Sequence, residues 1–218
     1  MSKLKPIVPK KNPPKKPVKR PAVPPGGIRI IGGLWKRSKL AVANFPGLRP
    51  TPDRVRETVF NWLGQDLSGW RCVDAFAGTG ALGFEAASRG AAQVLMCDQQ
   101  PAVVVQLQAV ALKLKANMVR VERTDGVSAL KRLVPKSMDL VFLDPPFDAM
   151  GVADAALSAA SSVVAEAGFV YLEAPSALTP EDAEVFGLQI HRAGKAGMVH
   201  YHLLQKLQLN NPTEVVLG

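Results

Sequence analysis

Asp144-Pro145-Pro146-Phe147 combines residue types that could bind and orient an amino group. Four apolar residues, 140–143, come before it, so a buried strand is expected to end at Asp144. Prolines fix φ and cannot donate to a sheet, which leaves a rigid turn with free carbonyl groups. A carboxylate and a carbonyl can accept both hydrogens of a planar NH2 group, while an aromatic ring stacks on the attached base. Taken alone, the tetrapeptide could equally be a strand-ending turn without a chemical role.

A glycine-containing loop, Asp74-Ala75-Phe76-Ala77-Gly78-Thr79-Gly80, is the second candidate segment. Its glycines permit a tight turn where the backbone can approach a ligand closely. The spacing differs from the dinucleotide fingerprint G-x-G-x-x-G, and the Lys-Ser/Thr pair of a P-loop is missing. A carboxylate at Asp74 repels pyrophosphate but suits a cationic amino group. S-adenosylmethionine, a nucleoside that carries an amino acid, fits both features.

Two further aspartates follow the next strands of the pattern. Asp98 ends the second strand, where carboxylates of doubly wound nucleoside sites bind ribose hydroxyls. Asp125 follows the third strand, where it could accept a hydrogen bond from an adenine amino group. An isolated aspartate at a strand end is more often a helix cap. Four acids at the carboxyl ends of successive parallel strands, together with the glycine loop, favour a ligand site instead.

Alternating strands and helices are expected to position these residues. Apolar strands are predicted at Cys72–Phe76, Val94–Cys97, Met118–Glu122, Leu140–Leu143 and Phe169–Glu173. Helices are predicted between them at Ala81–Arg89, Pro101–Lys115, Val127–Leu133 and Gly151–Ala165. This order is typical of an α/β doubly wound, Rossmann-like parallel sheet. Two later strands, Val185–His191 and Met198–Leu204, joined by a loop at 192–197, predict an antiparallel hairpin at the sheet edge.

Residues 1–26 form a basic tail in which eight Lys or Arg and no acid occupy the first 20 positions. Its many prolines and few apolar residues predict disorder. The tail could attract nucleic-acid phosphates without sequence preference, or it could be a solubilising leader. Residues 207–218 are taken as a second, C-terminal tail. The region 70–206 between the tails is the predicted catalytic domain.

Residues 27–69 are read as a small extension of this domain. Strands at 28–33 and 39–42 predict a hairpin around Trp35-Lys36-Arg37, where the indole could stack on a base or simply cover the hairpin. Thr51 or Asp53 could cap an amphipathic helix that begins near Arg54. Basic and polar residues of this extension are candidates for RNA contacts: Arg29, Trp35, Lys36, Arg37, Arg49, Thr51 and Arg56. Arg56 could instead be solvated or paired with Glu57.

The remaining composition argues against other classes of protein. Cys72 and Cys97 fall in predicted buried strands without a CxxC spacing, which disfavours disulfide and zinc sites. The three histidines are expected on a surface or hairpin rather than as metal ligands. No secretory signal or apolar membrane span is recognisable, so we expect a cytoplasmic protein without a membrane partner or a metal.

The chain resembles the bacterial small-subunit ribosomal RNA guanine-N2 methyltransferases over about residues 28–206. Matching segments are Arg29–Gly33, Gly47–Thr51, Asp53–Leu63, Phe76–Gly83 and Asp144–Phe147. The resemblance implies the seven-stranded class I methyltransferase fold, with S-adenosylmethionine as donor and S-adenosylhomocysteine as product. It also implies that the acceptor is guanine 966 of 16S rRNA, within the small subunit or a late assembly intermediate. The family often has Glu where Asp98 stands.

This resemblance assigns roles to the candidate residues. Asp144, Pro145 and Phe147 would hold the extruded guanine, with Asp144 also beside the donor. The cofactor would contact Asp74, Phe76, Ala77, Gly78, Thr79, Gly80, Asp98 and Asp125. We expect a monomer. Two other functions remain open: a DNA adenine-N6 or cytosine-N4 methyltransferase, which shares the Asp-Pro-Pro turn, and a noncatalytic RNA-binding assembly factor.

Overall fold

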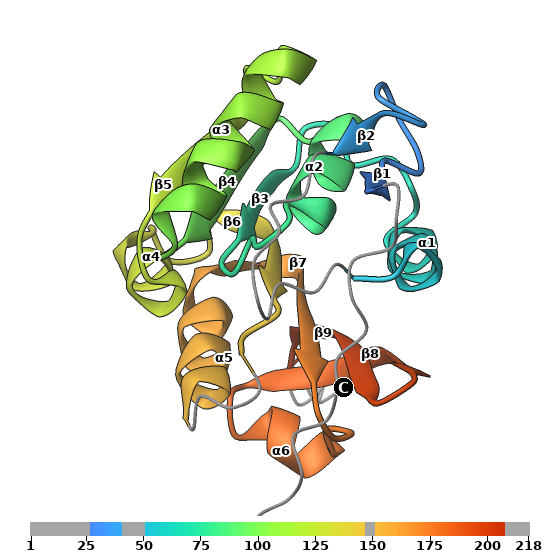
Figure 1. The fold of residues 1–218 in the computed structure, drawn as a ribbon. Coiled ribbons are helices and arrows are strands. Elements are labelled where there is room, and N and C mark those ends of the chain that lie inside the picture. Colours follow the sequence, from blue (N-terminus) through green and yellow to red (C-terminus); the bar gives the residue numbers. More distant parts are fainter. Residues whose placement is uncertain (1–26, 41–50, 147–150, 208–218) are drawn as a thin grey trace, which may run out of the picture.

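The computed structural model describes residues 27–40, 51–146 and 151–207. Its centre is a seven-stranded sheet in the order β5-β4-β3-β6-β7-β9-β8 (Figure 1). The first five strands of that order are parallel, and β9 is antiparallel to both of its neighbours. The predicted doubly wound, Rossmann-like sheet of seven strands with an antiparallel C-terminal hairpin is therefore confirmed.

A helix connects each parallel strand to the next one along the chain. The parallel strands are β3 (Arg71–Asp74), β4 (Gln93–Asp98), β5 (Val119–Arg123), β6 (Met138–Leu143) and β7 (Val164–Ala174). The connecting helices are α2 (Ala81–Ser88), α3 (Pro101–Leu114), α4 (Gly126–Arg132) and α5 (Val152–Val163). The main difference from the sequence expectation is β7, which begins directly after α5 rather than at Phe169.

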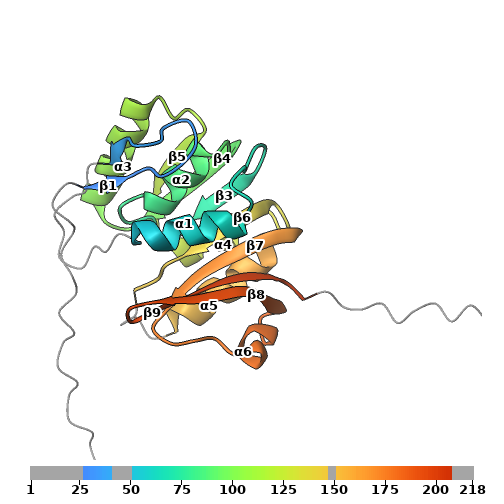
Figure 2. The same cartoon turned by 90° about the vertical axis from the view of Figure 1, so that its right-hand side faces the viewer.

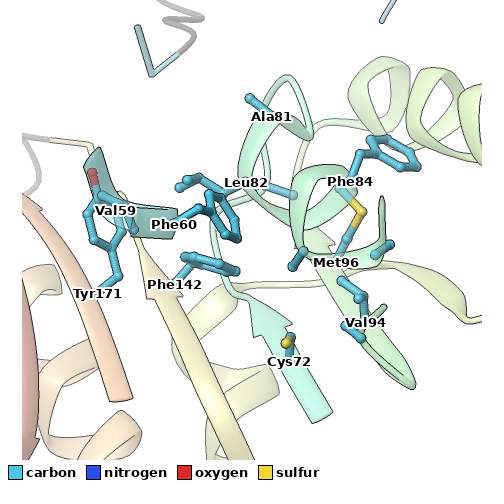
Figure 3. Packing of buried hydrophobic residues seen from close by; sticks show 14 of the residues in the cluster. Val59, Phe60, Cys72, Ala81, Leu82, Phe84, Val94, Met96, Phe142 and Tyr171 are labelled. Carbon is cyan, nitrogen blue, oxygen red and sulfur yellow. The ribbon is translucent and has the colours of Figure 1, made fainter. Parts of the chain in front are cut away.

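Helices cover both faces of the sheet. The first face packs against α1 (Asp53–Trp62), α2 and α3, and the second against α4, α5 and α6 (Pro180–Glu184). On the first face Phe60 of α1 points toward Phe142 of β6, with their ring centroids 6.1 Å apart (Figure 3). Tyr171 of β7 lies edge-on to the same Phe142 ring. Buried aromatic packing thus fixes α1 over the middle of the sheet.

The C-terminal hairpin is longer than its sequence suggests. Strands β8 (Leu188–Ala196) and β9 (Val199–Lys206) pair as far as Ala196 and Val199. The expected loop at 192–197 was wrong, because Arg192–Ala196 continue β8 and the turn is confined to Gly197 and Met198. The expected strand start at Val185 was also wrong, since α6 occupies the preceding residues with a Thr179–Asp182 capping box. That capping signal is present in the sequence and was missed.

The N-terminal extension begins with the antiparallel pair β1 (Ile28–Arg29) and β2 (Lys39–Leu40). Helix α1 follows, but its N-cap is Pro52 with no side-chain cap bond, so the expected caps Thr51 and Asp53 were wrong. Among the described residues no helix is long and apolar enough to cross a membrane.

Glu85 of α2 joins the extension to the sheet domain. Its buried carboxylate accepts hydrogen bonds from the backbone N–H groups of Ile31 and Gly32, both at 2.8 Å. It also pairs with Arg56 at 3.2 Å and Arg89 at 2.8 Å. A buried carboxylate needs such partners, because removing a charge from water is costly when it is left unpaired. The extension is therefore attached through a satisfied polar network as well as through apolar packing.

Candidate functional site

Four predicted aspartates end neighbouring strands along the carboxyl edge of the sheet. The strand order β5-β4-β3-β6 places Asp125, Asp98, Asp74 and Asp144 in that sequence along the edge. Figure 2 shows these strands side by side. The carboxyl edge of an open parallel sheet is where ligands bind. The fold therefore brings together the acidic turns that the sequence identified separately.

Asp74 is the most deeply buried of these acids, with 2% of its surface exposed. Its Oδ2 accepts a hydrogen bond from the Gly83 backbone N–H at 3.1 Å. Burial is the main reason that the pKa of Asp74 is raised to about 7; the negative charges of Asp98 and Glu173 contribute to this rise, and hydrogen bonds from the backbone of Gly83 and Phe76 oppose it. A carboxylate in this state gains from a cation placed beside it, since the cation restores the stabilisation that water would give.

The glycine loop between β3 and α2 is held by backbone contacts. Gly80 has φ +78° at the N-cap of α2, and a Cβ there would lie 2.6 Å from Leu107. The Gly78 N–H donates to Asp98 Oδ2 at 3.0 Å. This bond ties the loop after β3 to the end of β4. The loop residues Phe76, Ala77, Gly78 and Thr79 consequently line the edge between Asp74 and Asp98.

Gly126 was not among the predicted site residues. It begins α4, and an added Cβ would lie 2.1 Å from the carbonyl oxygen of Ala75. The loop after β3 and the start of α4 thus approach each other too closely for any other side chain. No sequence motif marked this position, because the contact joins two loops that are far apart in the chain.

Asp98 and Asp125 are half-exposed and partly engaged in the chain itself. Asp98 Oδ1 accepts from the Gln100 N–H at 2.8 Å. Asp125 caps α4 by accepting from the Ser128 N–H at 2.8 Å, and it also accepts from the Gln99 side chain at 2.8 Å. These hydrogen bonds, above all the one from the Ser128 backbone, lower the pKa of Asp125. Its carboxylate is therefore fixed in place and ionised, whether or not a ligand shares it.

The Asp144 turn follows β6 directly. Asp144 is half-buried, Pro145 is buried, and Pro146 is exposed. Asp144 is close enough to Tyr171 to raise the pKa of that hydroxyl, although burial is the larger cause. Phe147, the predicted stacking residue, lies outside the described residues.

Glu173 is an acidic residue that was not predicted as part of the site. It is the penultimate residue of β7, next to β6, and its carboxylate accepts hydrogen bonds from the hydroxyls of Thr51 and Tyr171, both at 2.9 Å. It is 5% exposed, and its charge reaches Asp74. The signal was available, because Val170-Tyr171-Leu172 is an apolar run that ends in an acid at the same edge.

The structure separates the predicted RNA contacts into two groups. Arg29, Lys36 and Arg37 are exposed, and Trp35 is half-buried against the core. Arg56 is fully buried and pairs with Glu85 and Asp53, rather than being solvated or paired with Glu57 as expected. Thr51 is also buried, with its hydroxyl on Glu173. Neither side chain is accessible to RNA, and Arg49 lies outside the described residues.

At this edge, Asp74 could bind a cationic group, and Asp98 and Asp125 could accept hydrogen bonds. The turn at Asp144 could accept hydrogen bonds from an amine. Within the described ranges no group of three or more His, Cys, Asp or Glu could hold a metal ion. The arrangement suits a nucleoside that bears an ammonium group next to a second, amine-bearing ring.

Comparison with protein families matches residues 28–205 to the model described as Conserved hypothetical protein 95. The chain is 40% identical to Ribosomal RNA small subunit methyltransferase D of Escherichia coli K12, over 83% of this chain and 91% of that protein. It is 45% identical over 127 residues to the protein of the same name from Haemophilus influenzae, covering 56% of this chain and 65% of that protein.

Among solved structures, the chain resembles the putative methyltransferase yhhF from Escherichia coli. The TM-score is 0.71 at 40% identity, and the match covers 83% of this chain and 98% of that one. The family match begins at residue 28, so it includes the N-terminal extension as well as the sheet domain.

Proposed function

The chain belongs to the Conserved hypothetical protein 95 family, and from this premise we propose that it methylates the exocyclic N2 of a guanine in small-subunit ribosomal RNA. The names of its relatives from Escherichia coli and Haemophilus influenzae support a ribosomal RNA acceptor. The position of Asp144-Pro145 at the edge beside Asp74 is the observation that carries the proposal. Guanine 966 of 16S rRNA is the target that the resemblance implies.

The residues of the donor subsite fit S-adenosylmethionine. Asp74 is a buried carboxylate with a raised pKa, which an ammonium group would stabilise. The backbone of Gly78–Gly80 leaves room for close approach, and Asp98 stands where ribose hydroxyls bind. When bound, the donor supplies an electrophilic methyl group on a sulfonium and leaves as S-adenosylhomocysteine.

The acceptor subsite would make a weakly nucleophilic amine reactive. The lone pair of guanine N2 is delocalised into the ring, which makes the amine a poor nucleophile. The Asp144 carboxylate and the Pro145 carbonyl accept its two hydrogens, localise the lone pair and direct it at the methyl carbon. The nitrogen–carbon bond forms as the carbon–sulfur bond breaks, and Asp144 takes the proton released from N2. The guanine must leave its stack to reach this turn, and Phe147 would stack on the extruded base.

Substitution of Asp144 tests the proposal. Asp144→Ala should lower the rate of methyl transfer at least about a hundredfold, because an electrostatic contact to the reacting amine is lost. Calorimetry should show nearly unchanged affinity for S-adenosylmethionine. Asp98→Ala should do the opposite and mainly weaken cofactor binding. Asp66→Ala, an exposed aspartate before β3, is the matched control and should change neither quantity.

The acceptor is identified by tritium transfer from labelled S-adenosylmethionine. Small ribosomal subunits from cells that lack the gene should be labelled, and duplex DNA should not. Mapping by reverse-transcription stops then locates the modified guanine. Labelling of DNA alone would support the amino-methyltransferase of DNA, and failure to bind S-adenosylmethionine would favour the noncatalytic assembly factor.

A further inference from the structure

The turn of the β8–β9 hairpin lies at the same sheet edge as the Asp144 turn. Strand β9 runs antiparallel to β7, and His200 pairs with Ala174, the last residue of β7. Gly197 and Met198 therefore lie beyond the carboxyl end of β7. Because β7 is parallel to β6, this is also the edge at which Asp144 follows β6. We define the hairpin tip as residues 195–200.

The hairpin carries cationic side chains and no acidic ones. Residues 188–206 include Arg192, Lys195 and Lys206 but no Asp or Glu. Lys206, at the far end, pairs with Glu166. Lys195 is exposed, lies directly opposite His200, and forms no ion pair within the described part of the chain. A cation without an internal partner, next to a base-binding edge, is suited to a phosphate group.

Met198 gives the tip an apolar end. Its side chain is 72% exposed, and it follows Gly197, whose φ of +61° closes the tight turn. A thioether chain is unbranched and adapts to irregular apolar surfaces such as the face of a base. Exposed at a turn, it contributes little to the core of the protein.

The tip is supported rather than loosely attached. Tyr201 stacks on Trp62 of α1 with ring centroids 5.4 Å apart. A Cβ on Gly194 would lie 2.4 Å from the Tyr201 ring, so that ring covers the neighbouring strand at the glycine. Strand β9 is also paired on both sides, by β7 and β8. The position of the tip relative to the edge is thus fixed by packing.

We propose that the hairpin tip is an RNA-binding element beside the acceptor turn. Lys195 binds a phosphate that flanks the target nucleotide, and Met198 packs against an adjacent base or ribose. This inference rests on the proposed function for the identity of the RNA. It does not depend on the chemistry at Asp144.

Equilibrium binding at several salt concentrations tests the proposal. The full chain, saturated with S-adenosylhomocysteine, is titrated against a fluorescent transcript of small-subunit rRNA. Lys195→Ala should weaken binding about threefold to tenfold and reduce the slope of log K against log salt by about one. Met198→Ser should weaken binding without changing that slope. Lys113→Ala removes an exposed lysine near the end of α3, at the opposite edge, and should have no effect.

The outcomes separate this inference from the function it rests on. Equal binding by the Lys195→Ala and Lys113→Ala variants would overturn the hairpin proposal, even if methyl transfer to small subunits is normal. Lysine-dependent RNA binding without any methyl transfer would support the hairpin and overturn the proposed function. Binding of the hairpin to acidic phospholipid vesicles but not to RNA would overturn the RNA assignment. Unchanged melting temperatures of both hairpin variants confirm that they fold, and Lys195→Glu provides a second, stronger variant.

Discussion

The two halves of the sheet edge are built in different ways. The donor half consists of the ends of β3, β4 and β5 with their following loops, and short-range turns such as Gly78–Gly80 shape it. The acceptor half consists of the ends of β6 and β7, the hairpin tip and Thr51. There the Thr51 hydroxyl reaches Glu173 across 122 positions in the chain. The proposed donor subsite is therefore formed by residues that are close in the chain, whereas the proposed acceptor subsite depends on segments that only the fold brings together.

Glu85 joins the N-terminal extension to the sheet domain, and its loss should have the largest effect on stability. Glu85→Ala removes the buried carboxylate partner of Arg56, which keeps only the exposed carboxylate of Asp53, and it removes two backbone contacts to the extension. We expect the free energy of unfolding to fall by about 3–5 kcal/mol, measured by denaturant titration. Glu57→Ala removes an exposed glutamate of α1 and should change stability by less than about 0.5 kcal/mol. Similar stability of the two variants would show that the extension is held by apolar packing alone.

The titration of Asp74 should make both the stability of the protein and its affinity for the donor depend on pH. Its pKa is raised to about 7 in the folded state from 3.8, so the folded protein binds the extra proton between these values. The free energy of unfolding attributable to Asp74 therefore falls as pH rises from about 4 to 7 and is level above that. Affinity for the ammonium group of the donor should rise over pH 6 to 8, because only the carboxylate pairs with it.

Asp74→Asn separates these two effects. At pH 8 it should stabilise the cofactor-free protein by roughly 1–3 kcal/mol, because the buried charge is gone. It should also weaken S-adenosylmethionine binding and reduce its pH dependence, as measured by calorimetry. Retention of the wild-type pH dependence by this variant would place the titrating group elsewhere.

Substitution of Glu173 tests whether methyl transfer can be slowed without weakening donor binding. Its expected effect is the smallest of those considered. Glu173→Ala removes the common acceptor of Thr51 and Tyr171. We expect a rate of methyl transfer about tenfold lower, because Tyr171, which is close to Asp144, loses the acceptor that positions its hydroxyl. Affinity for S-adenosylmethionine should change by less than about twofold. Glu173→Gln should restore much of the stability, because its amide oxygen can accept the same hydroxyls.

Glu184→Ala, which removes an exposed glutamate of α6, is the matched control for this prediction. If Glu173→Ala instead weakens donor binding as strongly as it slows transfer, the two halves are energetically coupled.

Most of the donor half could be predicted from the sequence. The strand–loop–helix pattern located Asp74, Asp98 and Asp125, because each lies at or just after the end of a predicted strand. The alternation of strands and helices also predicted the parallel sheet and its antiparallel end. Gly126 was not predicted, because the requirement for glycine comes from the Ala75 carbonyl, which approaches this position only in the folded chain.

The acceptor half was predicted less completely. The Asp144-Pro145 turn was recognised from its residue types. The burial of Arg56 and Thr51 was not predicted, because polar residues in and before an amphipathic helix are normally expected to face solvent. The hairpin was placed correctly but its strands were cut short. Gly194, Gly197 and the small residues near them resemble a loop, and only the Tyr201 ring over Gly194 explains their extended pairing.

The sequence by itself determined the residue types of the site and the family, because local turns and short motifs carry both. Only the tertiary structure decided that Glu173 and the hairpin tip lie beside Asp144. The reason is physical: strand order and register set which distant segments share an edge, and they depend on packing across the whole sheet.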